Sequence, residues 1–266
     1  MTIKEMIEGY QSQGLTIAQA RSLVAQRIIL STIEKSIFVD KVLLKGGVVM
    51  YNMTQEKRRS TIDLDFDFVK YNIGDSKNIE RFIETLNKLN IDYYITIDGP
   101  IQELNQHDYH GKRVKVLIKD ETYAIKFKID IGVHTLLTIN QNKMCFSFNN
   151  DKQLFLRVNP PEQIFSEKLF SLAKIGSTSQ RYRDVDDLYY LIMNQSLKGE
   201  IVKECLRLLT INQPYEIKDI DDVIAKADDC LNDSFFIENY KSNNGSWLNL
   251  EYNVAKSAIL DFIYNL

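Results

Sequence analysis

The sequence predicts an α+β fold, in which helices flank a mixed β-sheet and a helical domain follows. Apolar and polar residues alternate over residues 60–69 and 123–133, a pattern typical of half-buried strands. Apolar residues recur at helical spacing over residues 15–36 and 77–90. Beyond residue 160 the periodic stretches are all helical.

The length and this change of pattern indicate two domains. The chain has 266 residues, which is enough for one large domain or two small ones. Its pattern turns from mixed to helical near residues 155–160. We therefore expect a first domain over residues 1–158 and a helical C-terminal domain over residues 159–266.

The composition is that of an ordinary soluble globular protein, with 44% hydrophobic and 26% charged residues. The net charge of −3 gives no overall basic field, so any contact with nucleic acid must come from local patches. Cys145, Cys205 and Cys230 lack zinc-ligand spacing and suit free thiols in a reducing compartment. The sequence has no signal peptide and no apolar run of membrane-spanning length, so we expect a cytoplasmic protein with no membrane partner.

The first elements lead into the acidic strand. An amphipathic helix is expected over residues 15–36, with Thr16 as its cap. Residues 38–45 are strand-like, and residues 48–53 suit one or two helical turns. Residues 60–69 then form the acidic strand.

The middle of the chain combines one helix with several strands. Residues 77–90 form a helix with its apolar side chains on one side. Strands are expected over residues 92–97, 113–118 and 123–133, with a polar loop between the first two. Residues 144–148 are a further strand candidate.

The C-terminal third is helical throughout. Pro161 suits the first position of a helix, and Gly176 suits its end. Further helices are expected over residues 181–195, 198–212, 219–231 and 247–264.

The stretch from residue 45 to residue 70, KGGVVMYNMTQEKRRSTIDLDFDFVK, carries the strongest chemical signal. Alternate side chains of a strand point to the same face, so Asp63, Asp65 and Asp67 share one face with Thr61. The opposite face holds the apolar residues Ile62, Leu64, Phe66 and Phe68. Carboxylates stacked this closely repel one another unless a cation lies between them, and Mg²⁺ prefers such oxygen ligands.

The same stretch contains a candidate phosphate-binding element. Gly46 and Gly47 would open a short helix whose backbone N–H groups can hold a phosphate. Arg59 offers a planar, bidentate fork, and Ser60 or Thr61 offers a hydroxyl group.

The positions of Asp67 and Asp130 in their strands indicate whether each could be a metal ligand. Asp67 lies one pleat further along the strand and suits a solvated strand end. Asp130 is a lone acid between apolar neighbours on the strand over residues 123–133. Spacing alone fits an exposed acid and a metal ligand equally well.

The order of these residues resembles a known family. A diglycine followed by R-x-[ST]-x-D-x-D is similar to the minimal nucleotidyltransferase signature of DNA polymerase β-like enzymes. The form in this chain, LLKGGVVM and then RSTIDLDF, is most similar to the AbiEii abortive-infection toxins of type IV toxin–antitoxin systems. In motif terms the resemblance covers residues 38–195. It departs at residues 48–50, where Val-Val-Met replaces the common Thr-Ala-Leu and removes one phosphate donor.

The resemblance implies both a fold and a reaction. The fold would be a polymerase β-like nucleotidyltransferase sheet, with the C-terminal domain closing over the nucleotide. The reaction would be Mg²⁺-dependent transfer of NMP from an NTP, with Asp63, Asp65 and Asp130 holding two metal ions. Asp130 would also help to deprotonate the acceptor hydroxyl.

The resemblance extends to two helices of the second domain, which contain EKLFSLA and RYRDVDDLY. It implies that Lys168 binds the triphosphate and that an aspartate of the second helix supports catalysis; we choose Asp184 over Asp187. Composition alone would instead make Lys168 a lysine that reaches to water and Asp184 a helix cap. Arg181 and Arg183 are candidate phosphate or RNA contacts. An RNA acceptor could also be contacted by Tyr182 and by the basic residues Arg58, Arg59, Lys112 and Arg113.

The resemblance also implies partners. The acceptor would be RNA, with tRNA 3′ ends as the leading candidate, and a cognate AbiEi-like antitoxin would bind the protein. Two alternatives stay open. One is a nucleotidyltransferase that modifies an antibiotic or a protein, which the net charge fits at least as well as it fits an RNA acceptor. The other is a non-catalytic nucleotide-sensing module, against which the presence of all three carboxylates argues.

Overall fold

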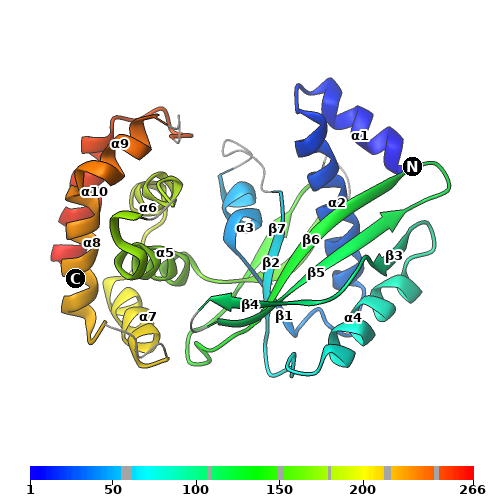
Figure 1. Ribbon diagram of the computed structural model, residues 1–266, viewed down its shortest axis with the longest axis horizontal. Helices are drawn as coiled ribbons and strands as arrows, with labels where there is room; N and C mark the ends of the chain where they lie inside the picture. The colour runs from blue at the N-terminus through cyan, green and yellow to red at the C-terminus, as the bar shows by residue number, and fades with distance from the viewer. Residues whose placement is uncertain (55–61, 107–108, 149–152, 179–180, 213–216, 243–245) are drawn as a thin grey trace. The chain divides into compact units, whose positions relative to one another are not determined.

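The computed structural model in Figure 1 describes residues 1–54, 62–106, 109–148, 153–178, 181–212, 217–242 and 246–266. The chain folds into two compact units. Unit 1 contains Met1–His134 and Gln141–Val158, and unit 2 contains Thr135–Asn140 and Asn159–Leu266.

Unit 1 is built on an eight-stranded mixed sheet. Its strands are β1 (Val42–Lys45), β2 (Leu64–Phe68), β3 (Tyr94–Ile97), β4 (Gln102–Gln106), β5 (Tyr109–Lys119), β6 (Ala124–Val133), β7 (Asn142–Phe146) and β8 (Leu154–Val158). The order is β3-β5-β6-β2-β1-β8-β7, and β4 pairs with β5. The pairs β2–β6 and β1–β8 are parallel and the others antiparallel. The predicted α+β class with a mixed sheet is therefore confirmed.

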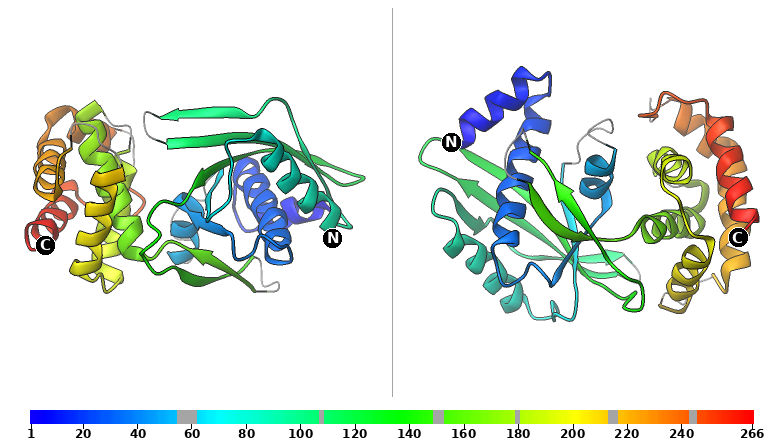
Figure 2. Two further views of the ribbon diagram at one scale, coloured as in Figure 1. Left: turned by 90° about the horizontal axis from the view of Figure 1, so that it is seen from below. Right: turned by 180° about the vertical axis from the view of Figure 1, so that it is seen from behind.

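The helices of unit 1 are α1 (Ile3–Ser12), α2 (Ile17–Glu34), α3 (Gly46–Met53) and α4 (Ser76–Leu89). Thr16 caps α2 in a capping box with Gln19, as the sequence predicts. Helix α2, drawn in blue in Figure 2, contacts α1, α4, β6 and β8. Most of its residues are buried, so it is not the one-sided amphipathic helix that we expected. Helix α1 was not predicted.

The apolar face of β2 packs on α4. Phe66 and Phe68 are fully buried, and the ring of Phe82 in α4 lies 5.7 and 5.1 Å from their centroids. The aspartates of β2 alternate with these phenylalanines, so their side chains leave from the other face. Ile62 precedes the strand and is 63% exposed, so its predicted place on the apolar face is wrong.

Two other parts of unit 1 differ from expectation. The polar loop expected before residue 113 contains β4, which pairs antiparallel with β5. An edge hairpin needs no apolar alternation, so its polar sequence concealed it. Strand β8 was also missed, and it pairs with β1 on one side and β7 on the other.

Unit 2 is helical. Its helices are α5 (Pro161–Ile175), α6 (Arg183–Asn194), α7 (Gly199–Asn212), α8 (Ile220–Asn232), α9 (Ser234–Ser242) and α10 (Tyr252–Tyr264). Helix α5 contacts α6, α7 and α8. Pro161 opens α5 and Gly176, with φ of +65°, ends it, as predicted. Helix α9 was not predicted, and α10 begins at Tyr252 instead of residue 247.

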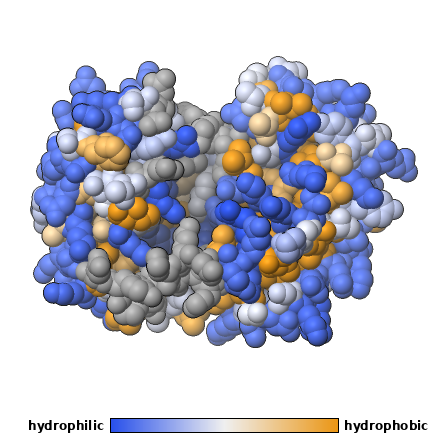
Figure 3. All heavy atoms as spheres, in the orientation of Figure 1, coloured by the Kyte–Doolittle hydropathy of each residue, from blue (hydrophilic) through white to orange (hydrophobic). Residues whose placement is uncertain are grey.

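The face of the molecule shown in Figure 3 is mainly hydrophilic, with apolar residues distributed among polar ones. No helix in the described part of the chain is long and apolar enough to cross a membrane. All three cysteines are free thiols. Burial raises the pKa of Cys205 and of Cys230 to about 12, so these two thiols are unreactive near neutral pH.

Candidate functional site

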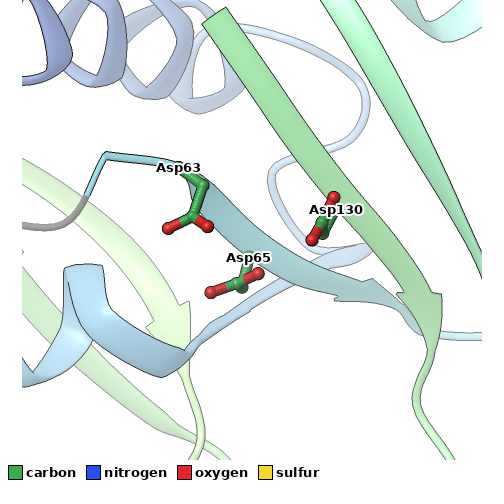
Figure 4. A group of neighbouring side chains, drawn as sticks. All are labelled: Asp63, Asp65 and Asp130. Atoms are coloured by element: carbon green, nitrogen blue, oxygen red, sulfur yellow. The ribbon is translucent and has the colours of Figure 1, made fainter. Parts of the chain in front are cut away.

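Three carboxylates lie together on the polar face of the central strands of unit 1 (Figure 4). Asp65 on β2 and Asp130 on β6 are directly paired in the parallel register, so their side chains leave from the same face. Asp63 lies just before β2. One oxygen of each carboxylate lies within 4.8 Å of the others. The structure thus brings together the three aspartates expected to bind metal.

Buried residues outside the cluster hold the backbone that carries Asp63 and Asp65. Gln26 of α2 is 1% exposed, and its side-chain amide donates a 3.2 Å hydrogen bond to the backbone carbonyl of Asp63. The buried rings of Phe66 and Phe68 set which face the alternating aspartates occupy. The backbone that carries Asp63 and Asp65 is therefore held by contacts that do not involve their carboxylates.

The cluster is electrostatically unfavourable without a cation. Burial, followed by repulsion from Asp63, raises the pKa of Asp65 to about 7, and Asp130 adds to the repulsion. Lys45 opposes this rise. Near neutral pH a proton on Asp65 or a bound metal cation would relieve this repulsion. The donor atoms are all carboxylate oxygens, which fits a hard divalent cation such as Mg²⁺.

Two protein cations flank the cluster. Arg113 on β5 donates from Nε to Oδ1 of Asp130 at 2.8 Å and from Nη2 to Oδ2 at 2.7 Å. Lys45 Nζ lies 2.6 Å from Oδ1 of Asp67. Asp67 is 5% exposed, so our expectation of a solvated strand end is wrong. The antiparallel β1–β2 pairing places Lys45 diagonally across from Asp67, and the ion pair compensates the burial of the carboxylate.

The diglycine lies against the carboxylates. Gly46 has φ of +66°, a region that glycine adopts without strain. A Cβ atom at this position would lie 2.6 Å from Oδ2 of Asp65, so glycine is required for space as well. Gly46 and Gly47 open α3, and no side chain caps the helix. The N–H groups of its first turn therefore begin beside Asp65. Arg59, Ser60 and Thr61, expected to bind phosphate, lie outside the described residues.

Unit 2 has its own charged cluster. Lys168 of α5 forms ion pairs with Asp184 and with Asp187 of α6, the second at 2.8 Å. Arg181 lies 3.8 Å from Asp184. We chose Asp184 over Asp187, but the structure places both beside Lys168. Only 13% of the Lys168 side chain is exposed, so it does not reach out to water.

A buried network extends behind this cluster, and sequence reasoning missed it. Trp247 Nε1 donates a 3.0 Å hydrogen bond to Asp187. Asp186 is fully buried and accepts hydrogen bonds from the Tyr240 hydroxyl at 2.6 Å and from the Leu248 amide at 3.2 Å. These contacts tie the segment before α10 to α6. The sequence signal was the three aspartates in RDVDD, all of which are buried.

Lys45 and Arg113 were not recognised as cations of the carboxylate site. Arg113 was considered only as a contact for an acceptor, and Lys45 only as the end of the preceding strand. The role of Arg113 would have followed from knowing that residue 113 pairs with residue 130 across the strands. For Lys45, the local sign in the sequence was its position directly before the diglycine.

Comparisons with known proteins agree with this geometry. The family model for the AbiEii toxin, a nucleotidyl transferase of type IV toxin–antitoxin systems, matches residues 28–230. A search of curated protein sequences gave no match. The solved structure of MenT4, a nucleotidyltransferase toxin from Mycobacterium tuberculosis, is similar with a TM-score of 0.66 at 13% identity, and the match covers 100% of this chain and 90% of that one. JHP933 from Helicobacter pylori is similar with a TM-score of 0.52 at 14% identity, over 94% of this chain and 92% of that one.

Proposed function

Because this chain belongs to the AbiEii family, and is thus a nucleotidyltransferase toxin of a type IV toxin–antitoxin system, we propose that it transfers NMP from an NTP to tRNA with the help of Mg²⁺. The family implies an NTP substrate and an antitoxin partner. Our proposal adds the metal, the acceptor and the residues that act.

The observation that carries the proposal is the meeting of Asp63, Asp65 and Asp130 at one place. These three residues would hold Mg²⁺, which in phosphoryl-type transfer neutralises charge on the triphosphate and orients the reacting oxygens. Asp130 would accept the proton of the acceptor hydroxyl as this oxygen attacks the α-phosphate, the bond to the β-phosphate breaks and pyrophosphate leaves. Since Asp65 has a pKa of about 7 in the metal-free protein, metal binding should displace a proton from the cluster.

The triphosphate would bind at the start of α3. The uncapped N–H groups after Lys45 begin beside Asp65, and a helix N-terminus favours phosphate. Arg59 and the hydroxyl of Ser60 or Thr61 would add donors to the same phosphate groups. We propose that Lys168, which pairs with Asp184 and Asp187, also binds the triphosphate, as the resemblance to the family implies.

The acceptor would contact local basic groups. The guanidinium of Arg183 lies 5.7 Å from the ring centre of Tyr182, which together offer a phosphate contact and a stacking surface. Lys112 and Arg113 are weaker candidates than the sequence suggests, because Lys112 pairs with Glu103 and Arg113 with Asp130. We propose tRNA as the acceptor and an AbiEi-like protein as the antitoxin.

The test is incorporation of label from each of the four α-labelled NTPs into total tRNA, with and without Mg²⁺. The wild-type protein and the matched surface variant Asp92→Asn should label tRNA only with Mg²⁺, and Asp65→Asn should not. Parallel reactions contain aminoglycosides or protein instead of tRNA. Label on one of these, with none on tRNA, would replace the proposed acceptor.

A growth assay separates the chemistry from the toxic role. Induced wild type and Asp92→Asn should stop bacterial growth, and Asp65→Asn should not. Growth arrest that persists in Asp65→Asn would show that toxicity does not need the carboxylate cluster.

A further inference from the structure

Arg113 is already bound to Asp130, one of the three candidate metal ligands of the carboxylate cluster. Its guanidinium forms two nearly parallel hydrogen bonds with Asp130, at 2.8 Å to Oδ1 and 2.7 Å to Oδ2. The two residues are directly paired in the β5–β6 register, so this contact follows from strand pairing alone. A fork of this kind uses a lone pair on each carboxylate oxygen.

The charge of Arg113 acts on the whole cluster. Its hydrogen bonds to Asp130 raise the pKa of Arg113, and Asp63 and Asp65 contribute to the same rise, so the group stays charged. A divalent cation that bound one oxygen of each aspartate would lie close to this guanidinium. Like charges at such a distance repel strongly, because part of the site is shielded from water.

The second cation near the site has a different partner. Lys45 pairs with Asp67, which lies outside the group of three carboxylates, and the exposed fractions of the two side chains are 19% and 7%. Arg113 pairs with a member of the group, and 35% of its side chain is exposed. Arg113 can therefore turn toward solvent or toward an anionic substrate without opening the core, whereas Lys45 cannot.

We propose that Arg113 is a counter-cation that holds Asp130 in the metal-free protein and releases it when a divalent cation enters the cluster. The inference rests on the proposed metal site. Arg113 thereby weakens metal binding in the absence of nucleotide. An NTP that accepts the released guanidinium on its phosphates removes this competition, so metal and nucleotide bind cooperatively.

The experiment is a titration of Mn²⁺ into the full-length protein without nucleotide, measured as free Mn²⁺ by electron paramagnetic resonance. Arg113→Gln should bind Mn²⁺ about tenfold more tightly than the wild type. The control is Lys126→Gln, which removes one positive charge from an exposed pair with Asp98 on the same sheet and should leave the affinity unchanged. Adding a non-hydrolysable NTP should strengthen Mn²⁺ binding more in the wild type than in Arg113→Gln.

Affinity in Arg113→Gln that equals or falls below the wild-type value would overturn the inference. A lower affinity would instead make Arg113 a positioning residue that orients Asp130 for the metal. If Asp65→Asn abolishes Mn²⁺ binding while Arg113→Gln leaves it unchanged, only this inference fails. If neither wild type nor Arg113→Gln binds Mn²⁺, the proposed metal site fails with it.

A second measurement follows a signal of the wild-type protein and needs a variant only for its assignment. The Nε–H signal of Arg113 is assigned in an NMR spectrum by its absence from the Arg113→Lys spectrum. Addition of Mg²⁺ should shift this signal toward the position of a solvent-exposed arginine. A signal that stays at the frequency of the hydrogen-bonded group at saturating Mg²⁺ would contradict release.

Discussion

Replacement of Asp65 by asparagine should remove a pH dependence of stability from the metal-free protein. Burial and the repulsion from Asp63 raise the pKa of Asp65 from 3.8 to about 7. The folded state thus binds a proton more tightly than the unfolded state. The stabilising contribution is complete below pH 3.8, and it is lost as the pH rises through 7.

The size of the effect follows from the shift. A rise of one pKa unit corresponds to about 1.4 kcal/mol, so the wild type should lose about 4 kcal/mol between pH 4 and pH 8 through this group. Asp65→Asn has a neutral side chain at every pH, so its unfolding free energy should not fall in this way between pH 4 and pH 8. The variant should therefore unfold at a higher urea concentration than the wild type at pH 8, although the substitution removes a charged residue of the site.

The assay is urea unfolding at several pH values in EDTA. The quantity to compare is the difference in unfolding free energy between Asp65→Asn and wild type, which should grow with pH. Asp92→Asn, an exposed aspartate on a loop, should give a difference that does not change with pH in this way. A constant difference for Asp65→Asn from pH 4 to pH 8 would refute the reasoning. Saturating Mg²⁺ should abolish the wild-type pH dependence, because the metal replaces the proton.

Two further substitutions test the packing around the two clusters. Gly46→Ala places a methyl group 2.6 Å from Asp65 at a φ of +66°, and should cost about 1–3 kcal/mol in urea unfolding. Gly14→Ala, also at positive φ but with no atom within 4 Å, should cost less; equal losses would exclude the contact as the cause. Trp247→Phe removes the 3.0 Å hydrogen bond to buried Asp187 and should cost about 1–2 kcal/mol. Unchanged stability would show that this bond contributes nothing measurable.

The face that Asp65 occupies could be predicted because strand alternation directly specifies the face of a side chain. Phe66 and Phe68 fixed the buried face, and the carboxylates had to take the other. The pairing of β2 with β6, which brings Asp130 to the same place, is a non-local choice that no local pattern encodes. A resemblance to a family supplied that link instead.

The burial of Asp67 could not be predicted, because it depends on a partner from another strand. Its charge is compensated by Lys45, and only the β1–β2 register brings the two together. The same reasoning applies to Arg113 and Asp130 across β5 and β6. Strand β4 was not predicted for a different reason: a polar edge strand has the composition of a loop.

The short segment Thr135–Asn140 belongs to unit 2 although unit 1 supplies the residues on both sides of it. The backbone consequently passes between the units three times along its length. Leu136 and Ile139 of this segment are buried, so a protein truncated after residue 158 would expose both of them to water. Recombination at a single point cannot exchange the helical half of this toxin for another, because a six-residue piece of it is encoded inside the other half.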